Sequence, residues 1–518
     1  MSAPAKEYAA GVRLIPATPT RLPRTGMHPE ARPRLRLEAP RRATGALAMA
    51  SAFAALLAAC TVGPDYVAPA SAAPASWQTP LGEGLSAQAS DAASRARWWA
   101  QFGDTTLAAL IEHALAANTD VRQARARLRE ARALRAQAAA DWYPSVNAAA
   151  SHSRSRGSGS YGSSRASSFY QAGFDAMWEA DLFGGVQRAN EAAQADMEAS
   201  EASLRDVQVT LAAEVALEYI NVRALQERLR IARRNLETLS DTAQLTAWRA
   251  SAGLDSALDA EQARANLEQT RAEVPVLETS LGEALNRIAV LLARTPGELD
   301  ARVTGAAPIP MRAVRLAVGI PAEALRERPD VRVAERNLAA ATARIGAAEA
   351  ARYPSLSLSG TLGLQSATAS GLDANDADAW SWAAQLAAPL YDGGRLRQQV
   401  EIRSAQQEQA LAAYEAAVLG ALEETENALA AFAGTQRQQA ALGAAVEAAR
   451  NAAMLARVQY ESGLIDFATL LVAERTQLVT ESSLAVASAE RAGAIVRLYK
   501  ALGGWSPEQP ASAQTSTR

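Results

Sequence analysis

Cysteine, histidine and aromatic residues are all scarce in this sequence. Among 518 residues there are one cysteine, three histidines and 5% aromatic residues. The single cysteine, Cys60, excludes an intrachain disulfide bond, and three scattered histidines exclude a zinc site of the usual type. The sequence also lacks a glycine-rich phosphate loop and a Gly-x-Ser-x-Gly nucleophile motif. We therefore predict a protein that is not an enzyme and that holds neither a metal nor a cofactor.

Negative charge exceeds positive charge after residue 59. Residues 1–59 carry nine Lys and Arg against three Asp and Glu, whereas the whole chain has a net charge of −3. The remainder is therefore acidic and has no basic tract, which argues against nucleic acid as a partner. No apolar run of about 18 residues follows Cys60, so we expect no transmembrane helix.

Proline is absent from two long stretches, between residues 144 and 275 and between residues 389 and 507. Within them the pattern is continuously helical over about 186–252 and about 395–462. At the rise of an α-helix each would be roughly 100 Å long. Alanine-rich helices of this length do not fit a compact globule, so we expect them to pack as coiled-coil-like pairs around a tube.

Each long helix is expected to end in a tight turn and to be followed by a returning helix. The turns are Gly253-Leu254-Asp255-Ser256 and Gly463-Leu464-Ile465-Asp466, and glycine is the usual residue just after a helix. Returning helices are predicted over 258–292 and 470–502. The two hairpin tips should therefore lie a full helix length from the strands that precede the long helices.

The N-terminal region carries an export signal. Arg41-Arg42 precedes a mostly apolar run that ends in Leu57-Ala58-Ala59-Cys60. A basic flank, an apolar core and small residues before a cleavage site are typical of a secretory signal peptide. The last four residues resemble a bacterial lipobox, which predicts cleavage between Ala59 and Cys60 and lipid attachment to Cys60. The alternative is a short buried helix with an inert cysteine.

The chain repeats itself at an interval of 210 residues. Asp120-Val121-Arg122 matches Asp330-Val331-Arg332, and Tyr143-Pro144-Ser145 matches Tyr353-Pro354-Ser355. Gly253-Leu254 matches Gly463-Leu464 at the same interval. This period is too long for a solenoid, so we predict two tandem copies of one domain-sized unit.

Alternating runs predict four strands, two in each copy. Apolar residues alternate with mostly polar ones around Phe174 and Trp178, and again around Leu362 and Trp382. Such runs with aromatic ends are the weak signature of an outer-membrane β-barrel, whereas the alternative is a soluble sandwich with one wet face. About eight strands are the fewest that close a barrel, and an open edge is not tolerated in lipid. Several chains would therefore share one barrel, with eight strands from two chains or twelve from three.

These motifs together resemble the outer membrane efflux protein family, in its lipoprotein branch of NodT type. The resemblance rests on their order: Cys60-Thr61-Val62-Gly63-Pro64-Asp65-Tyr66, Trp98-Trp99, Phe102-Gly103-Asp104, Arg328-Pro329-Asp330-Val331-Arg332 and both Tyr-Pro-Ser strand openings. It implies a mixed α and β membrane protein in which three chains form a 12-stranded barrel in the outer membrane, continuous with a long α-helical barrel in the periplasm. It also implies a lipid-anchored homotrimer that passes drugs or other toxic small molecules outward.

The resemblance assigns partners and site residues. The partners are a periplasmic adaptor (membrane fusion) protein and an inner-membrane pump of the resistance-nodulation-division type. Gly253, Leu254, Gly463 and Leu464 are the tip positions expected to meet the adaptor, and Asp466 and Asp255 are the candidates for the periplasmic gate. Some relatives carry the acid at the position of Ile465. The alternative for Asp466 is a solvated acid that caps the returning helix.

The expected organisation has six segments. These are 1–59 as an extension and signal peptide, 60–96 as a lipid-anchored tether, 97–295 as the first repeat with strands at about 142–156 and 168–180, 296–320 as a linker, 321–505 as the second repeat with strands at about 353–365 and 379–390, and 506–518 as a polar tail. Two other functions stay open, an outer membrane duct for type I-like protein secretion and a structural periplasmic lipoprotein without a pore.

Overall fold

The computed structural model describes residues 61–70, 73–88, 97–156, 166–299, 301–311, 316–374 and 376–504. The chain divides into two units, Met1–Leu57 and Ala58–Arg518, and every described residue belongs to the second unit. The expected signal peptide, Ala59 and Cys60, and the polar tail 506–518 lie outside the described residues.

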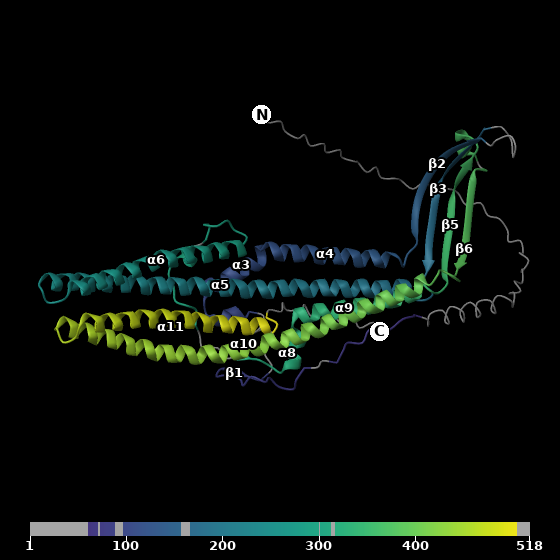
Figure 1. The fold of residues 1–518 in the computed structure, drawn as a ribbon. Coiled ribbons are helices and arrows are strands. Elements are labelled where there is room, and N and C mark those ends of the chain that lie inside the picture. The colour runs from purple at the N-terminus through teal and green to yellow at the C-terminus, as the bar shows by residue number, and fades with distance from the viewer. Residues whose placement is uncertain are drawn as a thin grey trace, which may run out of the picture. The chain divides into compact units, whose positions relative to one another are not determined.

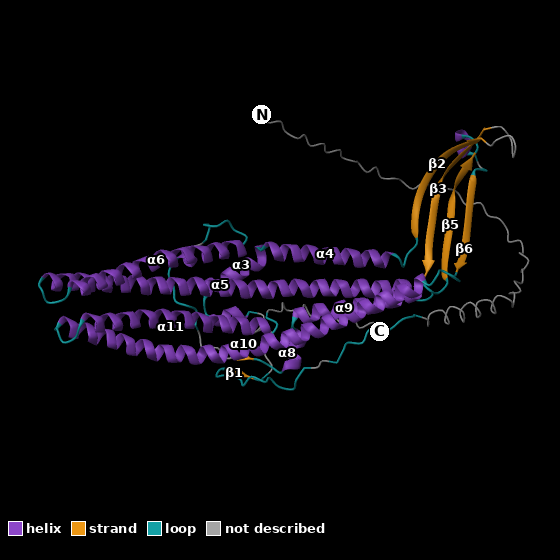
Figure 2. Ribbon diagram, viewed as in Figure 1, coloured by secondary structure: helices purple, strands orange, loops and turns teal. Residues whose placement is uncertain are grey.

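Helices and one antiparallel sheet make up the described chain (Figures 1 and 2). The elements are β1 (Leu85–Ser86), η1 (Trp98–Phe102), α3 (Thr105–Ala117), α4 (Thr119–Ala140), β2 (Ser145–Arg156), β3 (Ala166–Ala180), α5 (Gly185–Ser251), α6 (Ala257–Leu291), α7 (Ala301–Thr304), β4 (Leu316–Ala317), α8 (Pro321–Glu327), α9 (Pro329–Ala350), β5 (Ser355–Ser366), η2 (Ala369–Asp373), β6 (Asp378–Ala387), α10 (Arg395–Glu461) and α11 (Phe467–Ala501).

The main elements come in two sets of equal length. The long helices α5 and α10 have 67 residues each, the returning helices α6 and α11 have 35 each, and α4 and α9 have 22 each. Each member of the second set begins 210 residues after its counterpart, as β5 does after β2. A helix of 67 residues is roughly 100 Å long, and both long helices end at tips remote from the sheet (Figure 1).

The four main strands form one sheet in the order β2-β3-β5-β6, with β2 and β6 at its edges. All three pairings are antiparallel. The register places even-numbered residues of every strand on one face and odd-numbered residues on the other. β6 ends at Ala387, three residues before the expected end.

The two faces of the sheet differ in polarity. The even face is apolar and carries large exposed side chains: Val146, Phe174, Leu362, Trp380, Trp382 and Leu386. The odd face is mostly polar, and one row across all four strands consists of Asn147, Asp175, Thr361 and Ser381. In that row Asn147 Nδ2 donates to Asp175 Oδ2 over 3.1 Å, and the two hydroxyls lie 2.7 Å apart. One face of the sheet therefore suits an apolar surrounding and the other suits water.

The largest core cluster lies where α3, α5, α6 and α11 meet. The ring of Trp98 is 1% exposed and stacks on Tyr499 with 5.3 Å between centroids. Trp99 is 2% exposed, so the tryptophan pair packs in the core. Tyr219, on α5, donates a 2.7 Å hydrogen bond to Asp104, which also caps α3. Among the described residues no helix has both the length and the apolar character that a membrane crossing needs.

The segment expected to be a tether is extended, and several of its described residues are held against the helices. Arg188, which is 5% exposed, donates to the carbonyl of Val62 over 3.3 Å and to Asp65 over 2.7 Å. Gly63 has a φ of +90° and lies against Gly346, where a Cβ atom would meet the Gly346 Cα at 2.3 Å. Farther along the segment, Glu426 accepts hydrogen bonds from the backbone N–H groups of Gln78 and Thr79. Residues 61–66 are therefore seated on α5 and α9.

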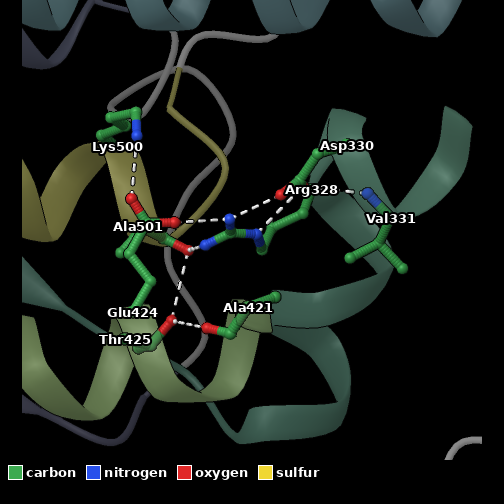
Figure 3. Close-up of polar contacts among 8 residues, drawn as sticks. All are labelled: Arg328, Asp330, Val331, Ala421, Glu424, Thr425, Lys500 and Ala501. Carbon is green, nitrogen blue, oxygen red and sulfur yellow. Dashed lines mark hydrogen bonds and ion pairs between the residues drawn. The ribbon is translucent and has the colours of Figure 1, made fainter. Parts of the chain in front are cut away.

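Two side chains at equivalent positions cap the ends of the returning helices. Asn118 separates α3 from α4, and its Nδ2 donates to Leu291 O over 2.9 Å. Arg328 stands 210 residues later, and its Nη1 donates to Ala501 O over 2.6 Å (Figure 3). Both bonds satisfy carbonyls that a helix end leaves without intrahelical partners. Each returning helix is therefore tied back to the start of its own half of the chain.

Arg328 makes more contacts than Asn118 does. Its guanidinium also pairs with Asp330 at 2.7 Å and with Glu424 at 2.6 Å, and Lys500 reaches the same glutamate at 2.8 Å. Burial is the largest single effect on the pKa of Asp330 and raises it. The hydrogen bond and charge of Arg328, together with backbone hydrogen bonds, outweigh burial and hold that pKa below its ordinary value. This ion cluster joins α9, α10 and α11 in one place (Figure 3).

Replacing Arg328 should destabilise the protein markedly. Arg328→Ala removes the 2.6 Å bond to a helix-end carbonyl and leaves the half-buried carboxylate of Asp330 without its guanidinium, at a cost of about 3 kcal/mol. Arg332→Ala, four residues along the same helix at an exposed position, should cost less than about 0.5 kcal/mol. Urea unfolding followed by circular dichroism in detergent measures both. Equal midpoints for the two variants would contradict the role assigned to Arg328.

Candidate functional site

The candidate site is the seam between two helical hairpins, one formed by α5 and α6 and the other by α10 and α11. Each hairpin tip is closed by a Schellman turn. In the first, Gly253 has a φ of +75°, and the Leu254 N–H donates to Arg249 O over 2.8 Å. In the second, Gly463 has a φ of +73°, and the Leu464 N–H donates to Gln459 O over the same distance. The predicted tip positions therefore form matching turns.

Both tip leucines point into solvent. Leu254 is 69% exposed and Leu464 is 75% exposed. Gly253 and Gly463 have open space where a Cβ atom would be, so their backbone conformation, and not crowding, requires glycine. The tips are thus rigid backbone turns that present one apolar side chain each.

Asp466 caps α11. Its Oδ1 accepts from the Thr469 N–H at 2.9 Å and from the Thr469 hydroxyl at 2.6 Å. These bonds hold the pKa of the Asp466 carboxyl below its ordinary value. On the first hairpin the counterpart is a capping box made by Ser256 and Asp259. The capping role considered for Asp466 is therefore present in the structure.

Asp255 is different, because it links the two hairpins. Arg249 donates to it twice, over 2.9 and 3.2 Å, from the same tip. Tyr460, on α10 of the other hairpin, also donates to Asp255 through its hydroxyl. The guanidinium of Arg249 lies over the Tyr460 ring, 4.7 Å from its centroid. The three side chains thus form one cluster across the seam.

The Arg249 charge favours an ionised Asp255, whereas burial keeps Tyr460 neutral. The bonds from Arg249 lower the pKa of Asp255 below its ordinary value. Burial raises the pKa of Tyr460 to about 12, so its hydroxyl keeps its proton and donates at every physiological pH. The Tyr460 hydroxyl also lies 3.1 Å from the Thr246 hydroxyl, which is fully buried on α5. Both hairpins therefore meet at Asp255.

The polar seam continues away from the tips. Glu474, on α11, is 3% exposed and lies 3.0 Å from the hydroxyl of Thr242 on α5. Arg475, beside it, donates to Asn266 of α6 over 2.8 Å. Glu481, two turns farther along α11, pairs with Arg450 of its own hairpin at 2.5 Å and lies 3.8 Å from Arg234 on α5 of the other hairpin. Hydrogen bonds and ion pairs, rather than large apolar side chains, therefore join the hairpins along much of this seam.

Sequence reasoning found only part of this site. Gly253, Leu254, Gly463 and Leu464 lie at the tips, and Asp255 and Asp466 lie just after them, but the structure does not bring Asp255 and Asp466 into contact. Arg249, Tyr460 and Glu474 were missed. Their only sequence signal is that they are polar or aromatic residues in alanine-rich helices, which does not distinguish a buried seam from a solvated face. Cys60 and Ala59 lie outside the described residues.

Comparison with known proteins identifies the family. The sequence model of the outer membrane efflux protein family matches residues 110–294 and 320–504. Among curated proteins, the chain is 34% identical to outer membrane protein OprJ of Pseudomonas aeruginosa over 87% of this chain and 94% of that protein. It is 32% identical to the toluene efflux pump outer membrane protein TtgI of Pseudomonas putida over 88% of this chain and 97% of that one.

A solved structure shares the fold. The outer-membrane channel OprN superimposes with a TM-score of 0.82 at 40% identity, over 86% of this chain and 99% of that chain. The expected mixed α and β membrane fold is confirmed at this level. The chain belongs to the outer membrane efflux protein family, whose members are channels rather than enzymes, and it is an outer membrane channel of a tripartite efflux system that extends into the periplasm.

Proposed function

We propose that three copies of this chain form one passive exit duct, with a shared barrel of twelve strands and a periplasmic tunnel of helices. The observation that carries the proposal is the four-stranded sheet, which has one apolar face, one polar face and two edge strands, β2 and β6. Edge strands leave backbone groups unpaired, and lipid does not tolerate them. Four strands are too few to close alone, whereas twelve enclose a water-filled lumen.

The two halves of each chain act as tandem repeats in this arrangement. The equal lengths of the paired helices and their constant offset of 210 residues support this. Each repeat supplies two strands to the barrel and one hairpin to the tunnel. With the apolar face turned to lipid, the row containing Asn147, Asp175, Thr361 and Ser381 faces the lumen.

The cargo we propose is drugs or other toxic small molecules. TtgI, which is 32% identical to this chain over the aligned residues, is named for toluene efflux. The duct has no energy source of its own, so an inner-membrane pump of the resistance-nodulation-division type must load it. A periplasmic adaptor would meet the hairpin tips at Gly253-Leu254 and Gly463-Leu464, where two exposed leucines stand on rigid turns.

Lipid attachment to Cys60 anchors the chain in this proposal. A lipid chain contributes about 0.8 kcal/mol per buried CH₂ group, so several chains on one cysteine give a stable anchor. Residues 61–66, which follow directly, are fixed to α5 by Arg188. Their docking would hold the anchor beside the junction of helices and strands.

The gate we propose is the cluster of Asp255, Arg249 and Tyr460, which ties one hairpin to the other at the tips. Asp466 stays a second candidate, since three such carboxylates around a pore would attract cations and repel anions. Its cap on α11 does not prevent this, because the side chain is exposed.

The susceptibility of cells tests the duct. Deletion of the gene should sensitise a strain without redundant ducts to a set of antibiotics, dyes, detergents or metal salts, and the wild-type gene should restore resistance. The Cys60→Ala variant should restore it only in part, because its anchor is lost. If deletion leaves the susceptibilities unchanged relative to a parent strain that expresses the protein, efflux is contradicted. Protein secretion would then be tested by comparing the levels of secreted proteins in the medium of the same strains.

Assembly is tested by electrophoresis. Protein extracted from membranes in mild detergent should migrate as a trimer when unheated and as a monomer after boiling, because a shared barrel is held by a continuous hydrogen-bonded ladder. A monomer at every temperature, with crosslinking also negative, would favour the structural lipoprotein without a pore.

The gate is tested by conductance in planar bilayers. Asp255→Asn and Tyr460→Phe should each raise the conductance of the reconstituted protein several-fold, since each removes a bond between the hairpins. Asp259→Asn, which alters a capping box on the same tip, is the matched control and should leave conductance unchanged.

The pH dependence of the Asp255 link has a definite sign. A carboxyl whose pKa is lowered in the joined state contributes stability above its ordinary pKa and loses it only as pH falls through the lowered pKa. The ordinary value is 3.8, so the contribution of this link to the joined state should be constant from pH 8 to pH 5.

In the conductance test, a conductance of Asp255→Asn equal to that of the wild type would exclude Asp255 from the gate.

A further inference from the structure

One acidic side chain in the seam lacks the partner that a buried charge requires. Glu474 is 3% exposed, and among the described residues its Oε2 atom has no hydrogen-bond partner. Its Oε1 atom lies 3.0 Å from the Thr242 hydroxyl. Glu481, on the same helix, is 6% exposed but is paired with Arg450. The two buried acids on α11 therefore have opposite surroundings.

The hydroxyl of Thr242 has to serve two neighbours with one proton. It lies 3.0 Å from Thr238 O and 3.0 Å from Glu474 Oε1. A backbone carbonyl only accepts hydrogen bonds, and a hydroxyl donates one and accepts two. If Thr242 donates to Thr238 O, the contact with Glu474 is a hydrogen bond only when the glutamate carries the proton and donates it. A neutral Glu474 satisfies both contacts, whereas an ionised one satisfies a single contact.

The charged groups around Glu474 do not compensate an ionised carboxylate. From α10, Arg457 acts on it through space, but this guanidinium donates to Thr238 O over 3.4 Å and lies 3.7 Å from Glu461. Arg475, on its own helix, donates to Asn266 of α6. From α5 the facing groups are Thr238 and Thr242.

Magnitudes decide between the two forms. Burying an ion without a paired partner costs several kcal/mol, and one hydrogen bond from a hydroxyl offsets only about 1–3 kcal/mol of it. Burial accordingly raises the pKa of Glu474 above its ordinary value of 4.5, and Thr242 and Arg457 offset this only in part. The neutral acid is therefore the form that this packing accepts.

Glu474 is connected to the tip cluster by a continuous series of contacts. Thr242 O accepts from the Thr246 hydroxyl over 2.8 Å, and Thr246 Oγ1 lies 3.1 Å from the Tyr460 hydroxyl, which donates to Asp255. Thr242 and Thr246 stand one turn apart on α5. The contact between Glu474 and Thr242 therefore also positions the face of α5 that meets Tyr460.

We propose that Glu474 is a positioning residue of the gate: as a neutral carboxylic acid it holds α11 against Thr242 of α5, and it makes the joined arrangement of the hairpins dependent on pH. The inference rests on the proposed role of the tip cluster as a gate. When the hairpins separate, water reaches the carboxyl, its O–H bond breaks, and the proton passes to water. Separation thus releases a proton, and acid pH opposes it.

The sign of the dependence follows from linkage. In the joined state the pKa of Glu474 lies above 4.5, and in the separated, hydrated state it returns toward 4.5. The joined state is therefore fully stabilised below pH 4.5 and loses stability as pH rises toward the raised pKa. The joined–separated equilibrium should change about tenfold for each pH unit by which the two pKa values differ.

The first measurement is infrared spectroscopy of the full-length lipidated trimer. The carbonyl stretch of a protonated carboxyl group should be present at pH 7, should be lost as the wild type is titrated to higher pH, and should be missing from Glu474→Gln. Glu481→Gln is the matched control and should keep the band. A wild type without the band at pH 7 overturns the proposal, and this reading depends neither on channel opening nor on the folding of a variant.

The second measurement is conductance in planar bilayers between pH 5 and pH 9. Wild type and Glu481→Gln should conduct more as pH rises, whereas Glu474→Gln should stay at the low level of the acidic wild type throughout. If the conductance of Glu474→Gln rises with pH as steeply as that of the wild type, the proposal is overturned. Asp255→Asn distinguishes failure of the gate itself from failure of the role of Glu474. If it conducts more than the wild type while Glu474→Gln behaves as the wild type does, the gate stands and only the role of Glu474 fails.

Discussion

The architecture depends on lateral packing along helices that cannot be stable alone. A helix of 67 residues gains little from intrinsic propensity, because most helical stability in proteins comes from packing of one face. In α5 and α9 alanine is the commonest buried residue, which lets backbones approach closely. Large side chains are concentrated instead in the core around Trp98 and Tyr219. The helices are thus held firmly in the middle and lightly toward the tips.

The two returning helices have their last carbonyls bonded by different kinds of side chain. Each returning helix ends at a carbonyl that a side chain 173 residues away must satisfy. Asn118 does so with a neutral amide, whereas Arg328 does so with a guanidinium that also holds two carboxylates. The second half is therefore the more strongly fixed, and it anchors α10 and α11 where they leave the core.

The sequence predicts the elements well and their mutual contacts poorly. Long stretches without proline give α5 and α10, and period-two alternation gives the strands, because both signals are local. The cap made by Asp466 is also local, three residues from its partner. The bond between Asp255 and Tyr460 spans 205 residues, and that between Thr242 and Glu474 spans 232. Such contacts depend on which helices become neighbours and on their rotation, and one sequence does not encode that in any short pattern.

The contacts of the segment after Cys60 were not predicted, for a related reason. Its proline-rich composition correctly indicates extended backbone, but composition does not report whether extended backbone is free or seated. The seat is Arg188, a single buried guanidinium 123 residues from Asp65. Gly63 and Gly346 make the seat possible by letting two backbones touch. Sequence reasoning would need the pairing of these two glycines, which no local rule supplies.

The proposed gate requires a seam that can open, and polar contacts suit such a seam. Apolar contact would hold the hairpins together with a free energy roughly proportional to buried area and nearly independent of conditions. Hydrogen bonds and ion pairs exchange readily for water, so their net contribution is small although each is geometrically specific. In the gate proposed above, such a seam would hold the hairpins in register and leave the joined and separated arrangements close in free energy. A buried acid such as Glu474 adds a term that is set by proton concentration, and a purely apolar seam has no such term.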